Sequence, residues 1–250
     1  RISTLYRRWR IISIVFWILI WQLAAQLIDN SIFLVGPLQV AGTLIRSLPE
    51  PDFWLRIVHS WLRIAVGFTS ALILGIFLGA LSCRRIVIRE FLGPAVQLMK
   101  SIPVASVVIL LLLWAGSRHL SAVISFVVVF PPIYFATLEG IRHTDPGLLE
   151  VGEVFCMPFA REVWYLYRPS VLPYLASACK SAVGMSWKSG AAAEVIGIPE
   201  GTIGERLYLS KIYLDTAQLF AWTAVILILS MLSERIVLWL LKRAGVGRCC

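Results

Sequence analysis

The sequence predicts an all-α, polytopic membrane protein with six transmembrane helices. Of its 250 residues, 59% are hydrophobic and only 15% are charged, and the mean hydropathy is +0.82. Soluble domains are about 45–50% apolar and about 25% charged. The composition therefore excludes most water-soluble enzymes, disordered chains and small disulfide-linked secreted modules. The gaps between charged residues also approach the roughly 20 apolar residues that a helix needs to cross a bilayer.

Six charge-poor segments have about this length. The first follows Arg10, and its long apolar run without a small-residue cleavage site favours a retained helix over a signal peptide. Only Arg118 and His119 separate the third from the fourth, which predicts a tight hairpin. The fifth is interrupted by Lys180 and Lys188. In order, the predicted spans are residues 11–28, 64–83, 101–117, 120–138, 170–193 and 216–241.

The net charge of +9 is interpreted as a sign of topology rather than of nucleic-acid binding. Lys and Arg collect in cytoplasmic loops and near anionic lipid headgroups. The orientation with both termini in the cytoplasm places the larger share of basic residues inside. These residues are Arg1, Arg7, Arg8, Arg10, Arg84, Arg85, Arg89, Lys100, Arg142, Arg161, Arg168, Lys242, Arg243 and Arg248.

The motifs of several enzyme classes are absent from the sequence. It has no phosphate-binding loop Gly-x-x-x-x-Gly-Lys-Ser/Thr, no His-Glu-x-x-His and no Gly-x-Ser-x-Gly. Cys83, Cys156, Cys179, Cys249 and Cys250 show no metal-binding or redox spacing and are expected to be reduced. We therefore expect no catalytic residue, metal site or cofactor in this chain, and any energy source must belong to another chain.

Residues 140–169 form a connection that is too long for a simple turn and too polar to span a membrane. Asp145 and Pro146 predict a helix start, and Pro158 predicts its end. A second short helix is expected over residues 159–167. The first helix would carry one apolar stripe, formed by Leu148, Val151, Val154 and Phe155. Such a helix can lie on the membrane surface, pack on its own bundle or dock in a groove of a partner, and the periodicity leaves all three open.

This loop resembles the EAA loop of the permease subunits of binding-protein-dependent ABC importers. Glu150 and Pro169 match the pattern of that loop. Val151 and Gly152 stand in place of its alanines, and Cys156 stands in place of its glycine.

The resemblance extends over residues 60–243 and is to the nitrate, sulfonate and taurine branch of that family. The residues that carry it are Ser60, Arg63, Gly67, Gly75, Gly79, Pro94, Ile102, Pro103, Leu113, Trp114, Ala115, Gly116, Trp187, Ala193, Glu194, Gly197, Gly201, Gly204, Tyr213 and Asp215. It implies the ABC type I importer permease fold in a bacterial inner membrane. It also implies a homodimer, an ATPase partner that binds ATP and Mg, and an extracytoplasmic substrate-binding protein. The implied solute is a sulfonate, taurine or nitrate-like anion, or a vitamin precursor.

By the same resemblance, the helix near residues 148–157 is a coupling helix that sits in a groove of the ATPase. The implied coupling residues are Leu148, Glu150, Val151, Gly152, Val154, Phe155, Cys156 and Pro169. For Glu150, an acid that stabilises its own helix is an equal alternative to a docking role. The implied organisation is an N-terminal helix and external loop (1–59), a permease domain (60–243, with the coupling loop at 140–169) and a short tail (244–250).

Charges in the fifth span suggest a translocation pathway. A charge at the membrane centre costs roughly 2.5–3.5 kcal/mol, so Lys188 and Glu194 should face protein or water. Together with Trp187 they are our candidate pathway residues. The alternative is that the lysines reach toward the headgroups and that a Lys–Glu pair closes the helix end. Lys180, nearer the cytoplasmic end, favours that alternative.

Two other functions remain as alternatives. An ion-coupled carrier or a channel would work without an ATPase, and it would more often show inverted repeats or paired intramembrane acids. An integral-membrane enzyme would need a cluster of polar catalytic residues at one membrane face. The chain has only three histidines, His59, His119 and His143, and lacks clustered acids, which disfavours the enzyme.

Overall fold

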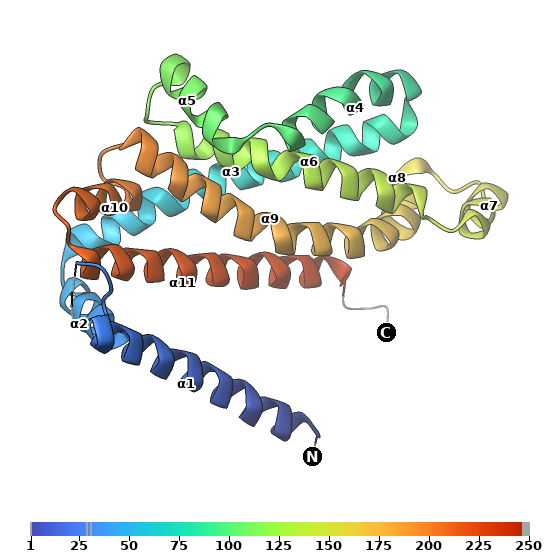
Figure 1. Ribbon diagram of the computed structural model, residues 1–250. Helices are drawn as coiled ribbons and strands as arrows, with labels where there is room; N and C mark the ends of the chain where they lie inside the picture. The colour runs from blue at the N-terminus through green and yellow to red at the C-terminus, as the bar shows by residue number, and fades with distance from the viewer. Residues whose placement is uncertain (1, 29, 31, 247–250) are drawn as a thin grey trace.

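The computed structural model describes residues 2–28, 30 and 32–246, which form a bundle of helices (Figure 1). Cys249 and Cys250, and two residues of the predicted inside set, Arg1 and Arg248, lie outside the described residues. The helices are α1 (Ile2–Ile28), α2 (Pro37–Ser47), α3 (Pro51–Arg84), α4 (Ile86–Ser101), α5 (Val104–Ala115), α6 (Leu120–Arg142), α7 (Pro146–Val154), α8 (Phe159–Glu162), the π-helix η1 (Val163–Tyr167), α9 (Arg168–Gly197), α10 (Ile203–Ile212), α11 (Thr216–Leu241) and the π-helix η2 (Lys242–Val246).

Three of these helices, α3, α6 and α11, are long and apolar enough to cross a membrane. They contain the second, fourth and sixth predicted spans, and α11 has the predicted bounds. With 34 residues, α3 is roughly 51 Å long at about 1.5 Å per residue, so it extends well beyond a bilayer core about 30 Å thick. The first and fifth predicted spans lie within α1 and α9. A count of six crossings stays a prediction, because neither α1 nor α9 meets the same criteria.

The third predicted span, residues 101–117, is not a single straight helix. Only α5 lies within these residues; α4 precedes it and ends at Ser101, and the two helices are bent by 103° relative to each other. Pro103 causes the break, because it lacks an N–H group and disfavours helical geometry at Ile102, whose ψ is 132°. At 12 residues, roughly 18 Å, α5 is too short to cross alone. The predicted hairpin is confirmed, since α6 begins at Leu120, directly after His119.

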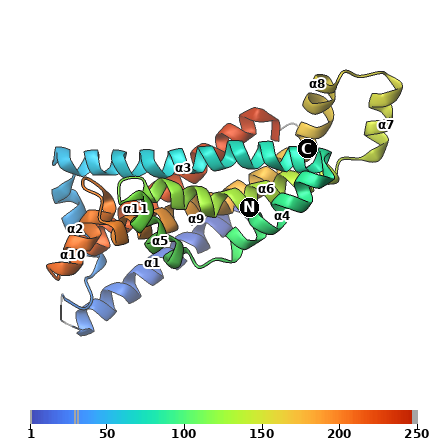
Figure 2. The same ribbon diagram turned by 90° about the horizontal axis from the view of Figure 1, so that it is seen from above.

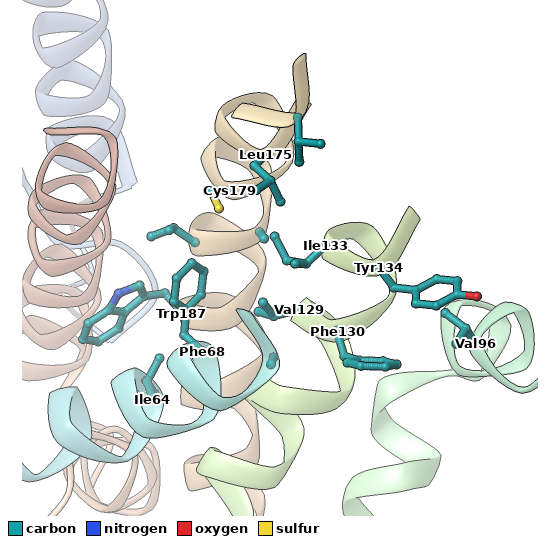
Figure 3. Close-up of a cluster of buried hydrophobic side chains, with 14 residues drawn as sticks. Ile64, Phe68, Val96, Val129, Phe130, Ile133, Tyr134, Leu175, Cys179 and Trp187 are labelled. Carbon is teal, nitrogen blue, oxygen red and sulfur yellow. The ribbon is translucent and has the colours of Figure 1, made fainter. Parts of the chain in front are cut away.

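The core forms where α6 packs against α3 on one side and α9 on the other (Figure 1). Glycines on α3 allow the close approach to α6: a β-carbon at Gly67 would lie 2.2 Å from the carbonyl oxygen of Ala122. Figure 3 shows the main cluster of buried side chains, which includes Ile64, Phe68, Val129, Phe130, Ile133, Tyr134, Leu175, Cys179 and Trp187.

The molecule has two distinct ends. Helices α2 and α10 lie at one end, and α7 and α8 lie at the other (Figures 1 and 2). α1 begins and α11 ends on the side toward α7 (Figure 1). An orientation with both termini in the cytoplasm stays a prediction.

Candidate functional site

The long loop begins with the predicted helix. The Asp145 carboxylate accepts a hydrogen bond of 2.9 Å from the N–H of Gly147, and Pro146 occupies the first position of α7. An aspartate cap and a first-position proline are both favourable at a helix start, because they satisfy or remove an N–H group that has no helical partner. The start predicted from Asp145 and Pro146 is confirmed.

The end of α7 is a Schellman motif, in which two N–H groups donate to carbonyls of the last turn. Met157 donates to Gly152, and Cys156 donates to Glu153, each at 2.9 Å. Cys156 takes the left-handed conformation that closes this motif, with a φ of +46°. Glycine usually occupies this position because it has no β-carbon. The cysteine therefore stands where both the backbone geometry and the EAA pattern favour glycine.

α7 has an apolar outer face and a packed inner face. Leu148, Val151, Val154 and Phe155 are all exposed, and Val154 retains 80% of its accessible surface. On the inner side Gly152 is buried, and a β-carbon there would lie 3.2 Å from Leu166. In both views the helix stands beyond the ends of the long helices (Figures 1 and 2). The apolar stripe thus points away from the bundle, which excludes packing of this stripe on its own bundle.

The second half of the loop differs from the prediction. The short helix expected over residues 159–167 is α8 followed by η1, and η1 continues into α9 without a break. Pro169 therefore lies near the start of α9 instead of ending a helix before it. Because the helical conformation is continuous from η1 into α9, Pro169 removes one backbone donor from within this helical segment.

The three candidate pathway residues lie on different sides of α9. Trp187 is buried, and its indole N–H donates to the hydroxyl of Ser233 on α11 at 3.1 Å. Glu194 is only 1% exposed and faces the interior of the protomer. Lys188 is exposed. The structure thus brings Trp187 and Glu194 to the inner side of α9 and leaves Lys188 on the outer side.

Glu194 belongs to a buried junction of three helices. Its carboxylate accepts hydrogen bonds from the Ser60 hydroxyl on α3 at 2.7 Å and from the Gly204 N–H on α10 at 3.3 Å. The Ser60 hydroxyl in turn accepts from the Ile203 N–H at 2.9 Å. We name Ser60, Glu194, Ile203 and Gly204 the Glu194 junction. It holds the ends of α9 and α10 against α3.

Sequence reasoning grouped Glu194 with Lys188 and missed this junction. A signal was present, because Trp187 and Glu194 are seven residues apart and so share a helix face, whereas Lys188 is turned by about 100° from Trp187. Ser60 and Gly204 were noticed only as points of resemblance. The geometry now gives them a physical role as partners of the carboxylate.

The outer side of α9 forms a continuous exposed face at helical spacing. We call it the open face of α9; its residues are Ser177, Ser181, Met185, Lys188 and Ala192. A cavity of about 310 Å³ adjoins this face and is lined by Met185 and Ser189 of α9, Lys100 of α4, and Pro131 and Pro132 of α6. Hydroxyl and ammonium groups are unfavourable against lipid tails. This face therefore requires water or another protein surface beside it.

Comparison with known proteins identifies the family. Residues 71–246 match the family described as binding-protein-dependent transport system inner membrane component. This chain belongs to that family. The permease is 23% identical to the taurine transport system permease protein TauC of Escherichia coli over 86% of its own length and 80% of the relative's.

Two further relatives have similar coverage. The putative aliphatic sulfonates transport permease protein SsuC of Bacillus subtilis is 24% identical over 88% of the permease and 80% of the relative. The bicarbonate transport system permease protein CmpB of Synechococcus elongatus is 29% identical over 75% of the permease and 68% of the relative. The predicted membership of an ABC importer permease family is thus confirmed, and so is a multi-pass membrane protein with a transport role.

Proposed function

We propose that two copies of this permease form the membrane passage of an ATP-driven importer, with both termini in the cytoplasm. A separate ATPase subunit supplies ATP hydrolysis, and an extracytoplasmic binding protein delivers the solute. The observation that carries the proposal is the exposed apolar face of α7. Four apolar side chains stand at the end of the molecule on a helix capped at both ends, and none of the residues that the structure describes buries them.

A short amphipathic helix that projects from a bundle is suited to a groove on a partner. In this mode of recognition, anchors at i, i+3, i+4 and i+7 positions enter apolar pockets. Leu148, Val151 and Phe155 have this spacing, and Val154 widens the stripe. The inner face of α7 packs on Leu166, so a force on α7 would pass through η1 directly to the start of α9. This connection offers a route from ATPase closure to movement of the span that carries the open face.

The coupling role is tested with Val154→Asp. A charge in an apolar groove should abolish ATPase binding, because an unpaired buried charge is strongly unfavourable. Val87→Asp is the matched control, since Val87 is 76% exposed and lies in the first turn of α4. Co-purification of the ATPase subunit and solute-stimulated ATP hydrolysis are measured. We expect both to be lost in Val154→Asp and kept in Val87→Asp.

If Val154→Asp still retained the ATPase, α7 would not be the coupling helix. Solute uptake by the permease in vesicles without any ATPase would instead support the alternative, an ion-coupled carrier or channel. The first outcome would contradict the docking site on α7, and the second would contradict ATP as the energy source.

For the solute, we propose a small anion that passes along the open face of α9. Lys188 lies on that face, and Lys100 lines the adjoining cavity. Several relatives are named for taurine, aliphatic sulfonates, bicarbonate or nitrate, which are anionic or zwitterionic, and another is named for formylaminopyrimidine. A cationic side chain beside a wet path stabilises such a solute in passage.

Lys188→Gln tests this role. We expect uptake of labelled taurine, nitrate or bicarbonate, whichever the intact system transports, to fall several-fold while ATPase binding is unchanged. Lys211→Gln on α10 is the control, because it removes the same charge from an exposed site away from the open face. Equal uptake by the two variants would remove Lys188 from the pathway.

A further inference from the structure

A second cavity, of about 740 Å³, lies at the α7 end of the molecule. Its walls come from the ends of α3 and α6, the start of α9 and the loop that carries α7. The volume falls within the range of about 300–1,000 Å³ that is usual for ligand sites. We call it the arginine cavity, because Arg84, Arg142 and Arg168 line it. It is distinct from the cavity beside the open face of α9.

One part of the wall of the arginine cavity is apolar, although Cys83, Thr137 and Thr144 also line the cavity. This apolar part is formed by side chains of the long helices, Ile76, Ala80, Ile141, Val171, Leu172 and Leu175. The first two precede Arg84 on α3, and the last three follow Arg168 on α9. Each helix therefore places apolar residues on the membrane side and an arginine at its end. A ligand that fills this space must have an apolar part as well as a charge.

Two of the arginines are positioned for an anion. Arg84 lies in the last turn of α3, and Arg142 lies in the last turn of α6. Neither has a carboxylate partner among the residues that the structure describes. The guanidinium of Arg84 lies 5.0 Å from the centroid of the Phe159 ring, which holds it beside the loop. Guanidinium groups form paired hydrogen bonds with phosphate oxygens, so this pair suits a phosphate.

The opposite side of the cavity is less suited to an anion. There Arg168 packs over the Trp164 ring at 3.8 Å. Burial and the nearby Glu162 carboxylate raise the pKa of the Tyr167 hydroxyl. A negative charge thus already lies beside Tyr167, and a second anion is favoured on the Arg84 and Arg142 side.

We propose that the arginine cavity binds an anionic phospholipid, with its phosphate between Arg84 and Arg142 and an acyl chain along the apolar wall. Basic pockets between membrane helices on the cytoplasmic side suit anionic headgroups. A soluble phosphate would satisfy the arginines but would leave the apolar wall unfilled. The assignment to the inner leaflet rests on the orientation given under the proposed function.

The position of the cavity links such a lipid to the coupling loop. Pro146 and Leu149 of α7 and Phe159 of α8 also line it. A bound phospholipid would contact the bundle and the coupling loop together. The lipid would therefore limit the positions that α7 can take relative to α9.

The test measures lipid binding to the full-length permease alone, delipidated in detergent, by native mass spectrometry. Phosphatidylglycerol is compared with phosphatidylcholine of the same acyl chains. The test variant is Arg84→Gln/Arg142→Gln. The matched control is Arg85→Gln/Arg161→Gln, which removes the same charge from neighbouring exposed positions outside the cavity lining. We expect phosphatidylglycerol affinity to fall about tenfold or more in the test variant, since two charge-assisted hydrogen-bonding groups are lost, and to be kept in the control.

A second variant tests the apolar wall without changing the charge. Ala80→Trp fills part of the wall and should also weaken phosphatidylglycerol binding. Equal affinity of the two double variants for phosphatidylglycerol would overturn the proposal. So would displacement of the lipid by millimolar inorganic phosphate together with no effect of Ala80→Trp, because the cavity would then hold a soluble anion. Since no ATPase is present, a negative result leaves the coupling test with Val154→Asp unaffected.

Discussion

At the scale of single residues, Cys156 is in the least favourable backbone conformation of the loop formed by residues 140–169. Its left-handed φ closes the Schellman motif at the end of α7. This conformation costs an L-residue about 1–2 kcal/mol, whereas glycine adopts it without a steric penalty. The two hydrogen bonds of the motif offset this cost.

Cys156→Gly should therefore stabilise the end of α7, by up to about 1 kcal/mol after the greater chain entropy of glycine is subtracted. Hydrogen exchange at the amides of Cys156 and Met157, which donate the two motif bonds, is the measurement. We expect slower exchange in the glycine variant. Cys156→Ala is the control, since it removes the thiol but keeps the β-carbon. Equal exchange in the two variants would show that the left-handed conformation does not limit the stability of the loop.

Residue spacing predicted some side-chain positions well and others poorly. The apolar stripe from Leu148 to Phe155 could be predicted because its residues recur at helical spacing within one short stretch of sequence. The environment of Glu194 was not found, because its partners Ser60 and Gly204 come from helices distant in sequence. A buried carboxylate and a carboxylate that lines a path look the same in one sequence. Only packing distinguishes them.

At the scale of elements, the junction between α9 and α10 depends on glycine at position 204, which has no side chain. A β-carbon at Gly204 would lie 2.2 Å from the β-carbon of Glu194 and 2.5 Å from its carbonyl carbon. Neither atom belongs to the flexible end of a side chain, so the backbones themselves must separate. The hydrogen bond from the Gly204 N–H to Glu194 would lengthen at the same time.

Gly204→Ala should loosen α10 and destabilise the fold by about 1–3 kcal/mol, the usual cost of overpacking. Gly42→Ala is the matched control, because Gly42 lies within α2 and has no other group within 4 Å of its added β-carbon. In a helix interior, alanine is more favourable than glycine, so the control should melt at the same or a higher temperature. Thermal unfolding in detergent and exchange at the α10 amides are measured. A Gly204→Ala variant as stable as Gly42→Ala would contradict the packing argument.

Element boundaries were predicted best where charge and hydropathy change abruptly. Thr216 and Leu241 bound both the predicted sixth span and α11. The α4–α5 pair was predicted poorly, because residues 86–101 contain Arg89, Glu90 and Lys100 and so resemble a loop. Their helix is amphipathic and has one buried side chain, Val96, in the cluster around α6. Tertiary packing therefore determines its helical state, and hydropathy does not reveal it.

At the scale of the whole molecule, the open face of α9 needs water or another protein surface beside it. A helix that faced lipid would resemble α11, whose exposed residues include Leu227, Ile228, Met231 and Leu232. The open face of α9 carries serines and a lysine instead. A second copy related by a two-fold axis would bring the two open faces together around a shared path.

This arrangement predicts disulfide cross-links between copies. In a background with all five native cysteines replaced by serine, Ser181→Cys should form covalent dimers on mild oxidation in membranes. Ile228→Cys on α11 is the control, since it is 59% exposed but lies on the apolar side. Dimers on a non-reducing gel are measured. Efficient cross-linking through Ile228→Cys and none through Ser181→Cys would place the dimer contact on α11 and contradict a contact through the open face of α9.

The bend between α4 and α5 has an energetic consequence for the membrane around it. The last carbonyls of α4 and the first N–H groups of α5 have no helical partners, and α5 has no side-chain cap. In hydrocarbon, each such group would cost several kcal/mol. Within a bilayer, these groups would therefore need water at the bend, beside Lys100 and the adjoining cavity. A solute that moves along α9 would meet a locally raised dielectric there, so the Born barrier to an anion would be lower at that level than across uninterrupted lipid.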